Sequence, residues 1–276
     1  MMLHEIAPYR MHIEYDKRAA APTDFVVVLQ KDSILVAAGE QTKLPTAEEL
    51  AVEGDDLQYL VRIDDAVFRM CPKEPETVPS GYEFLPMREL RTRKPMWCSY
   101  GALLAARIAI FYQSHRFCGI CGQSMKPSEN ERAMVCTGCG ATVYPPIGPA
   151  VIVLIRDGNR AVLTKYQASH SSYKRYALVA GYVETGETPE ETVIREVQEE
   201  VGLHVKNIRY YKSQPWPLSG TLLLGYVCDL DGEDTIVREE GELSVAEWVP
   251  REEIPNRADD VSLTSEMMER FRTGLL

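Results

Sequence analysis

The chain of 276 residues lacks an apolar run long enough to cross a membrane and lacks an N-terminal targeting pattern. Its most apolar windows, 147–155 and 101–112, are short, and the second carries Arg107, whereas a spanning helix needs about 20 apolar residues. The first eight residues show no basic stretch followed by an apolar run, so we expect no signal peptide. These absences predict a protein without a membrane partner. The seven cysteines are odd in number and four of them fall within 22 residues, unlike a secreted disulfide framework, so we expect a reducing cytoplasm.

Positive charge is also scarce, because 30 Lys and Arg residues stand against 41 Asp and Glu, a formal net charge of −11. Proteins that hold duplex nucleic acid or anionic membranes by their overall field gather Lys and Arg. We therefore expect no strong binding of duplex nucleic acid. A largely disordered chain is excluded as well, because 45% of the residues are hydrophobic.

Composition divides the chain into three zones, which we expect to form three domains. The first zone holds strand-like runs at 25–29 and 34–37 that indicate a hairpin, a capped turn at 46–50 and a helix over 100–113. It carries no chemical motif, so packing or dimerisation is its expected role. The expected boundaries are 1–114 for this β-rich α+β domain, 115–146 for a cysteine-rich module and 147–276 for the third domain.

The third zone alternates strands with helices, which is typical of an α/β or α+β domain. No internal repeat or low-complexity tract interrupts the alternation. Strands are expected near 150–155, 160–164, 222–227 and 246–249, and helices at 189–201 and 265–271.

Four of the seven cysteines form two closely spaced pairs. Cys118 and Cys121 flank Gly-Ile, Cys136 and Cys139 flank Thr-Gly, and 14 residues separate the pairs. Two such knuckles can present four thiolates to one tetrahedral Zn²⁺, which leaves no open coordination position. We therefore predict a zinc ribbon with one structural Zn²⁺, and disulfides or free thiols are the alternative. The remaining cysteines are expected to be ordinary buried residues: Cys71, Cys98 and Cys228.

An acidic segment over 181–203 reads GYVETGETPEETVIREVQEEVGL and carries signals for both ends of a helix. Thr188-Pro189-Glu190-Glu191 is a capping box with proline at the first helical position, and Gly202 supplies the stop. One face of this helix is apolar and is expected to pack on the core: Val193, Ile194, Val197 and Val201.

Glu196, Glu199 and Glu200 share another face, where neighbouring like charges destabilise a helix by about 0.2–0.5 kcal/mol per pair. A divalent cation removes that cost, because carboxylate oxygens suit Mg²⁺ or Mn²⁺, which keep water ligands and bridge to substrate phosphates. Arg195 can pair with a neighbouring carboxylate and fix its rotamer. The alternative is a solvated acidic face without a metal.

The same segment matches the pattern Gx5Ex7REUxEExGU at every specified position: Gly181, Glu187, Arg195, Glu196, Val197, Glu199, Glu200, Gly202 and Leu203. The chain therefore resembles the Nudix hydrolases. The resemblance implies an α/β/α sandwich, a loop–helix–loop metal site and hydrolysis of a nucleoside diphosphate linked to another group. It implies catalytic metals, more than one, held by Glu196 and Glu200 with Glu199 nearby, and a catalytic role for Arg195.

Ten residues past this segment lies Ser213-Gln214-Pro215-Trp216-Pro217, whose two prolines taken alone indicate a rigid turn. Together with the ribbon and the acidic helix, it resembles the SQPWPFPxS signature of the NADH pyrophosphatases, which also remove NAD caps from RNA. The stretch 111–119 is similar to that family's entry into its ribbon.

Carried over position by position, the resemblance implies that the metal site also uses the backbone of Ala180 and a distal carboxylate. Glu242, six residues before Trp248, is the candidate for this further ligand or base. Tyr182 stands where the family has an aromatic ring, commonly Phe, that stacks on the substrate. The other implied substrate contacts are Glu131, Tyr144, Gln214, Pro215, Trp216, Pro217, Leu218, Ser219, Gly220, Thr221 and Thr264.

Two stretches depart from the family pattern. Leu218-Ser219-Gly220-Thr221 follows Pro217 where the signature has Phe-Pro-x-Ser, and Ser262-Leu263-Thr264 stands where Ser-Ile-Ala is usual. Neither change touches the metal ligands, but a looser and less aromatic loop weakens the discrimination in favour of a nicotinamide ring.

The resemblance implies an enzyme that splits NADH or NAD⁺ into NMN(H) and AMP, removes NAD caps from RNA and forms a homodimer. The departures keep open a broader Nudix hydrolase that acts on ADP-ribose or dinucleoside polyphosphates. A nucleic-acid-binding zinc-ribbon module with a degenerate Nudix fold is the third hypothesis, against which the intact motif and the acidic charge argue.

Overall fold

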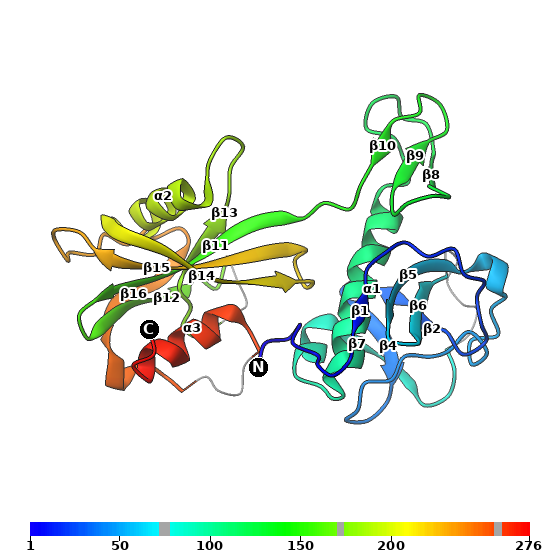
Figure 1. The fold of residues 1–276 in the computed structure, drawn as a ribbon, viewed down its shortest axis with the longest axis horizontal. Helices are drawn as coiled ribbons and strands as arrows, with labels where there is room; N and C mark the ends of the chain where they lie inside the picture. The colour runs from blue at the N-terminus through cyan, green and yellow to red at the C-terminus, as the bar shows by residue number, and fades with distance from the viewer. Residues whose placement is uncertain (72–77, 170–173, 257–260) are drawn as a thin grey trace. The chain divides into compact units, whose positions relative to one another are not determined.

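The computed structural model describes residues 1–71, 78–169, 174–256 and 261–276 (Figure 1). The contacts between residues divide the chain into two compact units. The first unit contains residues 1–2, 147–216 and 221–276, and the second contains residues 3–146 and 217–220.

A six-stranded sheet forms the centre of the first unit. Its strands follow the order β14-β15-β11-β12-β16, and β13 pairs with β11 off this path. β11 runs parallel to β15, whereas the other pairs are antiparallel. The strands are β11 (Gly148–Asp157), β12 (Arg160–Tyr166), β13 (Val179–Tyr182), β14 (Val205–Trp216), β15 (Thr221–Leu230) and β16 (Leu243–Pro250).

Two helices, α2 (Pro189–Val201) and α3 (Leu263–Arg272), cover the two faces of this sheet (Figure 1). Successive residues of a strand point to opposite faces, so β11 serves both layers. Val151 and Val153 pack in one core cluster with α2, whereas Ile152 and Leu154 pack in another with α3. This arrangement is the expected α/β/α sandwich.

The described part of the second unit holds three small sheets and the helix α1 (Met96–Ser114). One sheet has the order β1-β5-β6-β2 and another the order β3-β4-β7. α1 packs closely on the first of these, because a Cβ at Gly101 would lie 2.5 Å from the ring of Phe68. These strands are β1 (Met11–His12), β2 (Phe25–Val27), β3 (Leu29–Gln30), β4 (Ser33–Ala37), β5 (Gln58–Ile63), β6 (Ala66–Met70) and β7 (Tyr82–Pro86).

The third sheet of the second unit is the cysteine-rich ribbon, with the order β10-β9-β8. Arg132 ties the ribbon to the N-terminal strands, because its guanidinium donates to the carbonyls of Ile13 at 2.9 Å and Leu60 at 2.7 Å. The ribbon strands are β8 (Met125–Pro127), β9 (Met134–Cys136) and β10 (Thr142–Val143), and short 3₁₀ turns elsewhere in the chain lie at Gly54–Asp56, Met87–Arg91 and Arg251–Glu253.

Most elements lie where the sequence predicts them. α2 has the predicted bounds, and the helices expected at 100–113 and 265–271 lie within α1 and α3. The predicted hairpin is confirmed in β3 and β4, whereas β2 leaves it and pairs in parallel with β6. In the described segments, no helix has both the length and the apolar character needed to cross a membrane.

Two local predictions are corrected by the structure. Ile194 is half exposed, so the core-facing side of α2 is narrower than expected and consists of Val193, Val197 and Val201. The rigid turn expected over 213–217 begins later, because Ser213–Trp216 continue β14 and pair with β15. The division into three domains stays a prediction.

Candidate active site and zinc ribbon

The capping box fixes the start of α2. The Thr188 hydroxyl accepts a hydrogen bond from the Glu191 amide at 3.2 Å, and the Glu191 carboxylate accepts one from the Thr188 amide at 2.7 Å. Gly202 ends the helix in the left-handed conformation, with φ of 68°. Both ends of the helix that carries the acidic cluster are therefore determined locally.

Arg195 ties α2 to the segment before it and to β13. Its guanidinium donates to both carboxylate oxygens of Glu187, at 2.6 and 2.9 Å, and this pairing lowers the pKa of Glu187 to about 2. Further bonds reach Glu196 at 2.7 Å, Glu199 at 3.0 Å and the carbonyl of Tyr182 at 3.0 Å. Arg195 thus offsets part of the crowded negative charge, as the sequence predicts, and orients the carboxylates.

Glu196 lies against the backbone of β13. A Cβ at Gly181 would overlap the Glu196 carboxylate, so only glycine permits this approach. Burial raises the pKa of Glu196, with Arg195 opposing that effect and Glu199 and Glu242 adding to it. The carboxylate is therefore held in a confined position beside the sheet.

Glu200 is buried, with 4% of its surface exposed. One carboxylate oxygen accepts a hydrogen bond from the Ala180 amide at 3.3 Å, whereas Oε2 has no hydrogen-bond partner among the described residues. Burial is the main reason why the pKa of Glu200 is raised to about 8. The charges of Glu196, Glu242 and Glu199 contribute to this rise, whereas the hydrogen bond from the Ala180 amide opposes it. An unsatisfied buried carboxylate oxygen among other carboxylates is the arrangement that a divalent cation would neutralise.

Glu199 and Glu242 are the exposed members of the cluster. Glu242 directly precedes β16, where its amide donates to Glu239 at 2.6 Å and its carbonyl accepts from Gln167 at 2.7 Å. The carboxylate oxygens of this cluster are widely spaced. Among the described residues, only the four cysteines bring three or more possible ligand atoms within 4.8 Å of one another. The roles of Ala180, Glu196, Glu199, Glu200 and Glu242 as ligands or catalytic groups stay predictions.

Gln214 is fully buried at the end of β14. Its amide nitrogen donates to the Val261 carbonyl at 2.9 Å, and its amide oxygen accepts from the Leu263 amide at 2.7 Å. The amide group of Gln214 therefore holds the residue before the N-cap of α3 and the first residue of the helix, and Thr264 lies in its first turn. The sequence carried no signal for this contact, because the partners are 49 residues apart.

Most of the other expected substrate contacts lie near the β14–β15 connection, and two lie on the ribbon. Pro215 pairs with Leu222 and Trp216 with Thr221 across these strands. The connection itself groups with the second unit: Pro217, Leu218, Ser219 and Gly220. Glu131 and Tyr144 lie on the ribbon, where the Tyr144 hydroxyl donates to the Glu131 carboxylate at 3.1 Å.

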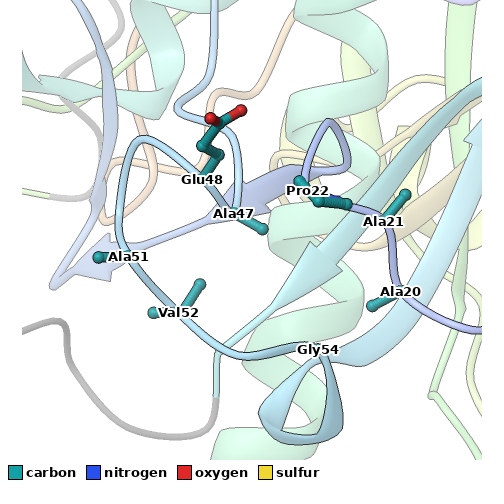
Figure 2. A pocket seen from close by; sticks show the side chains of 8 residues that line it. All are labelled: Ala20, Ala21, Pro22, Ala47, Glu48, Ala51, Val52 and Gly54. Atoms are coloured by element: carbon teal, nitrogen blue, oxygen red, sulfur yellow. The ribbon is translucent and has the colours of Figure 1, made fainter.

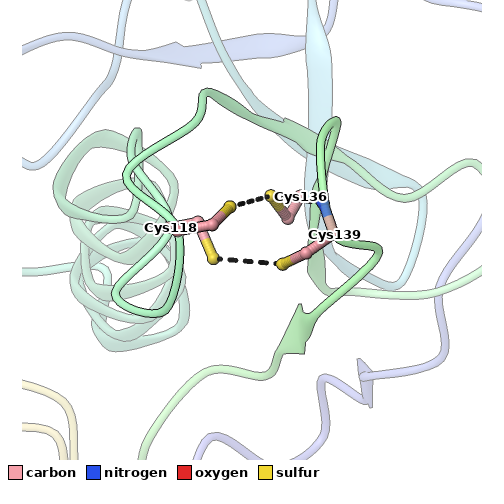
Figure 3. A group of neighbouring side chains, drawn as sticks. Cys118, Cys136 and Cys139 are labelled. Atoms are coloured by element: carbon pink, nitrogen blue, oxygen red, sulfur yellow. Dashed lines mark hydrogen bonds between the residues drawn. The ribbon is translucent and has the colours of Figure 1, made fainter.

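The four expected zinc ligands converge in the ribbon (Figure 3). The sulfurs of Cys118 and Cys139 are 3.7 Å apart, and those of Cys121 and Cys136 are 3.4 Å apart. A tetrahedral ion with Zn–S distances of about 2.3 Å needs sulfurs about 3.8 Å apart. The donor set therefore fits one Zn²⁺ held structurally.

Backbone amides also favour thiolates in the ribbon. The Ile120 amide donates to the Cys118 sulfur, and the Gly138 and Cys139 amides donate to the Cys136 sulfur, each at 3.4 Å. The amides of Cys139 and Gly138, that of Cys139 foremost, lower the pKa of Cys136 to about 6. The remaining cysteines lie apart from the ribbon: Cys98 and Cys228 are buried as predicted, and Cys71 is partly buried.

A pocket in the second unit, of about 530 Å³, does not involve any of the expected site residues (Figure 2). The described part of its lining consists of small apolar side chains, such as Ala20, Pro22 and Val52, with Glu48 as its one charged group. Ligand sites usually combine an apolar wall with several convergent polar groups, which this lining lacks.

Comparison with known proteins agrees with the geometry. A NUDIX domain model matches residues 146–271, and an NADH pyrophosphatase zinc ribbon domain model matches residues 113–144. A Chromobacterium violaceum protein named NAD-capped RNA hydrolase NudC is 38% identical over 186 residues, 67% of this chain and 69% of that protein. The chain belongs to the NudC family of Nudix hydrolases.

Other NudC relatives align over a shorter stretch. An Enterobacter protein of the same name is 41% identical over 149 residues, which cover 54% of this chain and 57% of the relative. A Nudix hydrolase structure from Nitrosomonas europaea superposes with a TM-score of 0.50 at 22% identity, covering 57% of this chain and 90% of that one. This last similarity concerns the fold, which is that of a Nudix domain.

Proposed function

We propose that the chain hydrolyses the pyrophosphate of NAD⁺ and NADH to give NMN or NMNH and AMP, and removes NAD caps from RNA 5′ ends. The observation that carries the proposal is Glu200, a buried carboxylate with one unpartnered oxygen beside Glu196 and the backbone of β13. The names of the NudC relatives support the choice of substrate.

The proposed metal site holds Mg²⁺ or Mn²⁺, more than one ion, through Ala180, Glu196 and Glu200, with Glu199 and Glu242 as further ligands. When bound, such ions neutralise the pyrophosphate and lower the pKa of the attacking water. Glu200 stays oriented by the Ala180 amide, and Arg195 holds Glu196 and Glu199. Glu199 and Glu242 are exposed, so either carboxylate can accept the proton of the water.

The zinc ribbon serves as structure in this proposal, since four protein sulfurs leave no position for a substrate. Thiolate ligands persist in a reducing compartment, which supports a cytoplasmic location. We further propose a homodimer in which the second subunit completes the substrate pocket. Sedimentation velocity measures the oligomeric state directly, and a monomer at working concentrations would contradict this part of the proposal.

The variant E200Q tests the metal site. It keeps the side-chain volume but removes a charged ligand, so kcat for NADH in Mg²⁺ or Mn²⁺ should fall at least about a hundredfold, because changes even around metal ligands cost 10–100-fold. E190Q is the matched control on the same helix, since Glu190 bonds only the Tyr226 hydroxyl among the contacts described, at 2.8 Å. Near-normal turnover by E200Q would overturn the assigned site.

A broader substrate range is the second candidate, favoured by the Leu218-Ser219-Gly220-Thr221 departure. Chromatography of the products formed from NADH, NAD-capped RNA, ADP-ribose and diadenosine polyphosphates separates the candidates. Faster hydrolysis of ADP-ribose than of NADH would replace the NADH-selective proposal. A binding module with a degenerate Nudix fold instead predicts no turnover of any of these substrates.

A further inference from the structure

Tyr182 is an exposed ring placed next to the acidic cluster. It follows Ala180 and Gly181, whose backbone contacts Glu200 and Glu196, on the same short strand β13. Tyr182 is 54% exposed, whereas Val179 at the other end of the same strand is fully buried. Contacts outside β13 are therefore needed to hold this large exposed ring in one orientation.

The strand pairing places Tyr182 and Thr221 on opposite sides of β11. Ala150 of β11 pairs with Tyr182 of β13, and Gly148 of β11 pairs with Thr221 of β15. Gly148 has no side chain, and a Cβ there would lie 2.9 Å from Cε1 of the tyrosine ring. The ring therefore crosses β11 over the bare backbone of Gly148.

The hydroxyl of Tyr182 forms a hydrogen bond on the far side of β11. The hydroxyl oxygens of Tyr182 and Thr221 are 3.2 Å apart, with either atom able to donate. Thr221 is buried, with its backbone paired on one side to Gly148 and on the other to Trp216, so its hydroxyl has a fixed position. One ring edge rests on backbone and its tip is hydrogen-bonded, while the rest stays open to solvent.

We propose that Thr221 is a positioning residue that locks the Tyr182 ring across Gly148 as a preformed stacking surface for a planar ring of the dinucleotide. The inference rests on the proposed function and on the contact between Tyr182 and the substrate that the family resemblance predicts. A side chain ordered before binding loses less freedom when the ligand arrives, and so binds more tightly. A phenylalanine at 182 can stack equally well, but it cannot reach Thr221 with a hydrogen bond.

The test compares Y182F, T221V and the double variant, with kcat and KM measured for NADH. NADH fluorescence titration in buffer without added divalent metal gives Kd separately from turnover. Loss of the hydroxyl pair should raise KM and Kd by about three- to tenfold, the range of one hydrogen bond, and leave kcat within about twofold. Because the two changes break the same bond, the double variant should bind no more weakly than either single one.

Two further variants separate positioning from general destabilisation. T221S keeps the hydroxyl and should recover most of the affinity that T221V loses. Y226F removes a different phenol bond of the same sheet, to Glu190, and should leave Kd unchanged. Unchanged Kd in Y182F and T221V, or additive losses in the double variant, would overturn the lock. Wild-type protein that binds NADH but releases no AMP in Mg²⁺ or Mn²⁺ would instead refute the proposed hydrolysis. Wild-type protein that hydrolyses NADH in Mg²⁺ or Mn²⁺ but does not bind it in metal-free buffer would refute the lock alone.

Discussion

At the scale of a single residue, the ionised form of Glu200 is unfavourable in the folded protein without a bound cation. Its carboxylate is buried, one oxygen has no partner among the described residues, and its pKa is raised to about 8. The folded protein without a divalent ion therefore favours the protonated form, whereas the unfolded chain releases the proton near pH 4.5. The contribution of Glu200 to the free energy of unfolding is therefore fully present below about pH 4.5 and is lost as the pH rises toward 8.

The variant E200Q should accordingly be more stable than the wild type at pH 7 in buffer without divalent ions. The unfolding free energy should rise by a value on the order of 3 kcal/mol, because the pKa lies at about 8 instead of 4.5, and the difference should vanish near pH 4. Urea denaturation at several pH values measures this. A variant less stable than the wild type at pH 7 would show that the carboxylate is already satisfied without a cation.

At the scale of elements, two side chains outside the cluster fix the helices that frame the site. Gln214 of β14 holds the first turn of α3, and Thr188 caps α2. Each accepts a hydrogen bond from a backbone amide at the start of a helix, which has no partner within the helix itself. These two contacts fix where α3 and α2 begin, and with them the positions of Thr264, Glu196, Glu199 and Glu200 along the helices.

Replacing Gln214 by Leu should lower the unfolding free energy by about 1–3 kcal/mol, because two buried hydrogen bonds to the backbone are lost. Q198L, at an exposed position of α2, is the matched control and should change stability little. Urea denaturation compares the two. Equal stability of Q214L and wild type would mean that α3 begins without this contact.

The variant T188A should lower the unfolding free energy by about 1 kcal/mol, since the capping hydroxyl satisfies the Glu191 amide. The loss should appear as a lower urea midpoint with an unchanged denaturant slope. A midpoint identical to that of the wild type would show that the glutamate half of the box is sufficient.

Over the whole molecule, the negative charge is concentrated where cations are expected. The segment 181–203 holds seven glutamates and one arginine, a net −6 out of the total −11. The rest of the chain is only mildly acidic, so it need not repel a dinucleotide. Bound divalent ions would reverse the sign of the local field.

The two compact units should also respond differently to loss of zinc. Structural zinc contributes folding free energy directly, and Arg132 couples the ribbon to the N-terminal strands. C136S should therefore lose zinc and amide-exchange protection over 3–146, while residues 147–216 and 221–276 keep theirs. Hydrogen exchange and elemental analysis provide the measurements. A fully protected, zinc-loaded C136S would contradict the ribbon.

The sequence by itself determined the features that depend on near neighbours. The bounds of α2, the shared face of Glu196, Glu199 and Glu200 and the two CxxC knuckles follow from spacing along a helix or a turn. Such spacings fix geometry without reference to the rest of the chain. The membership of the family followed from the same local patterns.

Only the tertiary structure decided the features that join distant segments. Glu200 meets the Ala180 amide 20 residues away, the Tyr182 and Thr221 hydroxyls meet across 39 residues, and Gln214 reaches Leu263 across 49. β2 also lies in a different sheet from β3, although the two strands are close in the sequence. These contacts depend on which strands pair and in which register, and that outcome is set by the packing of the whole sheet and not by any local spacing.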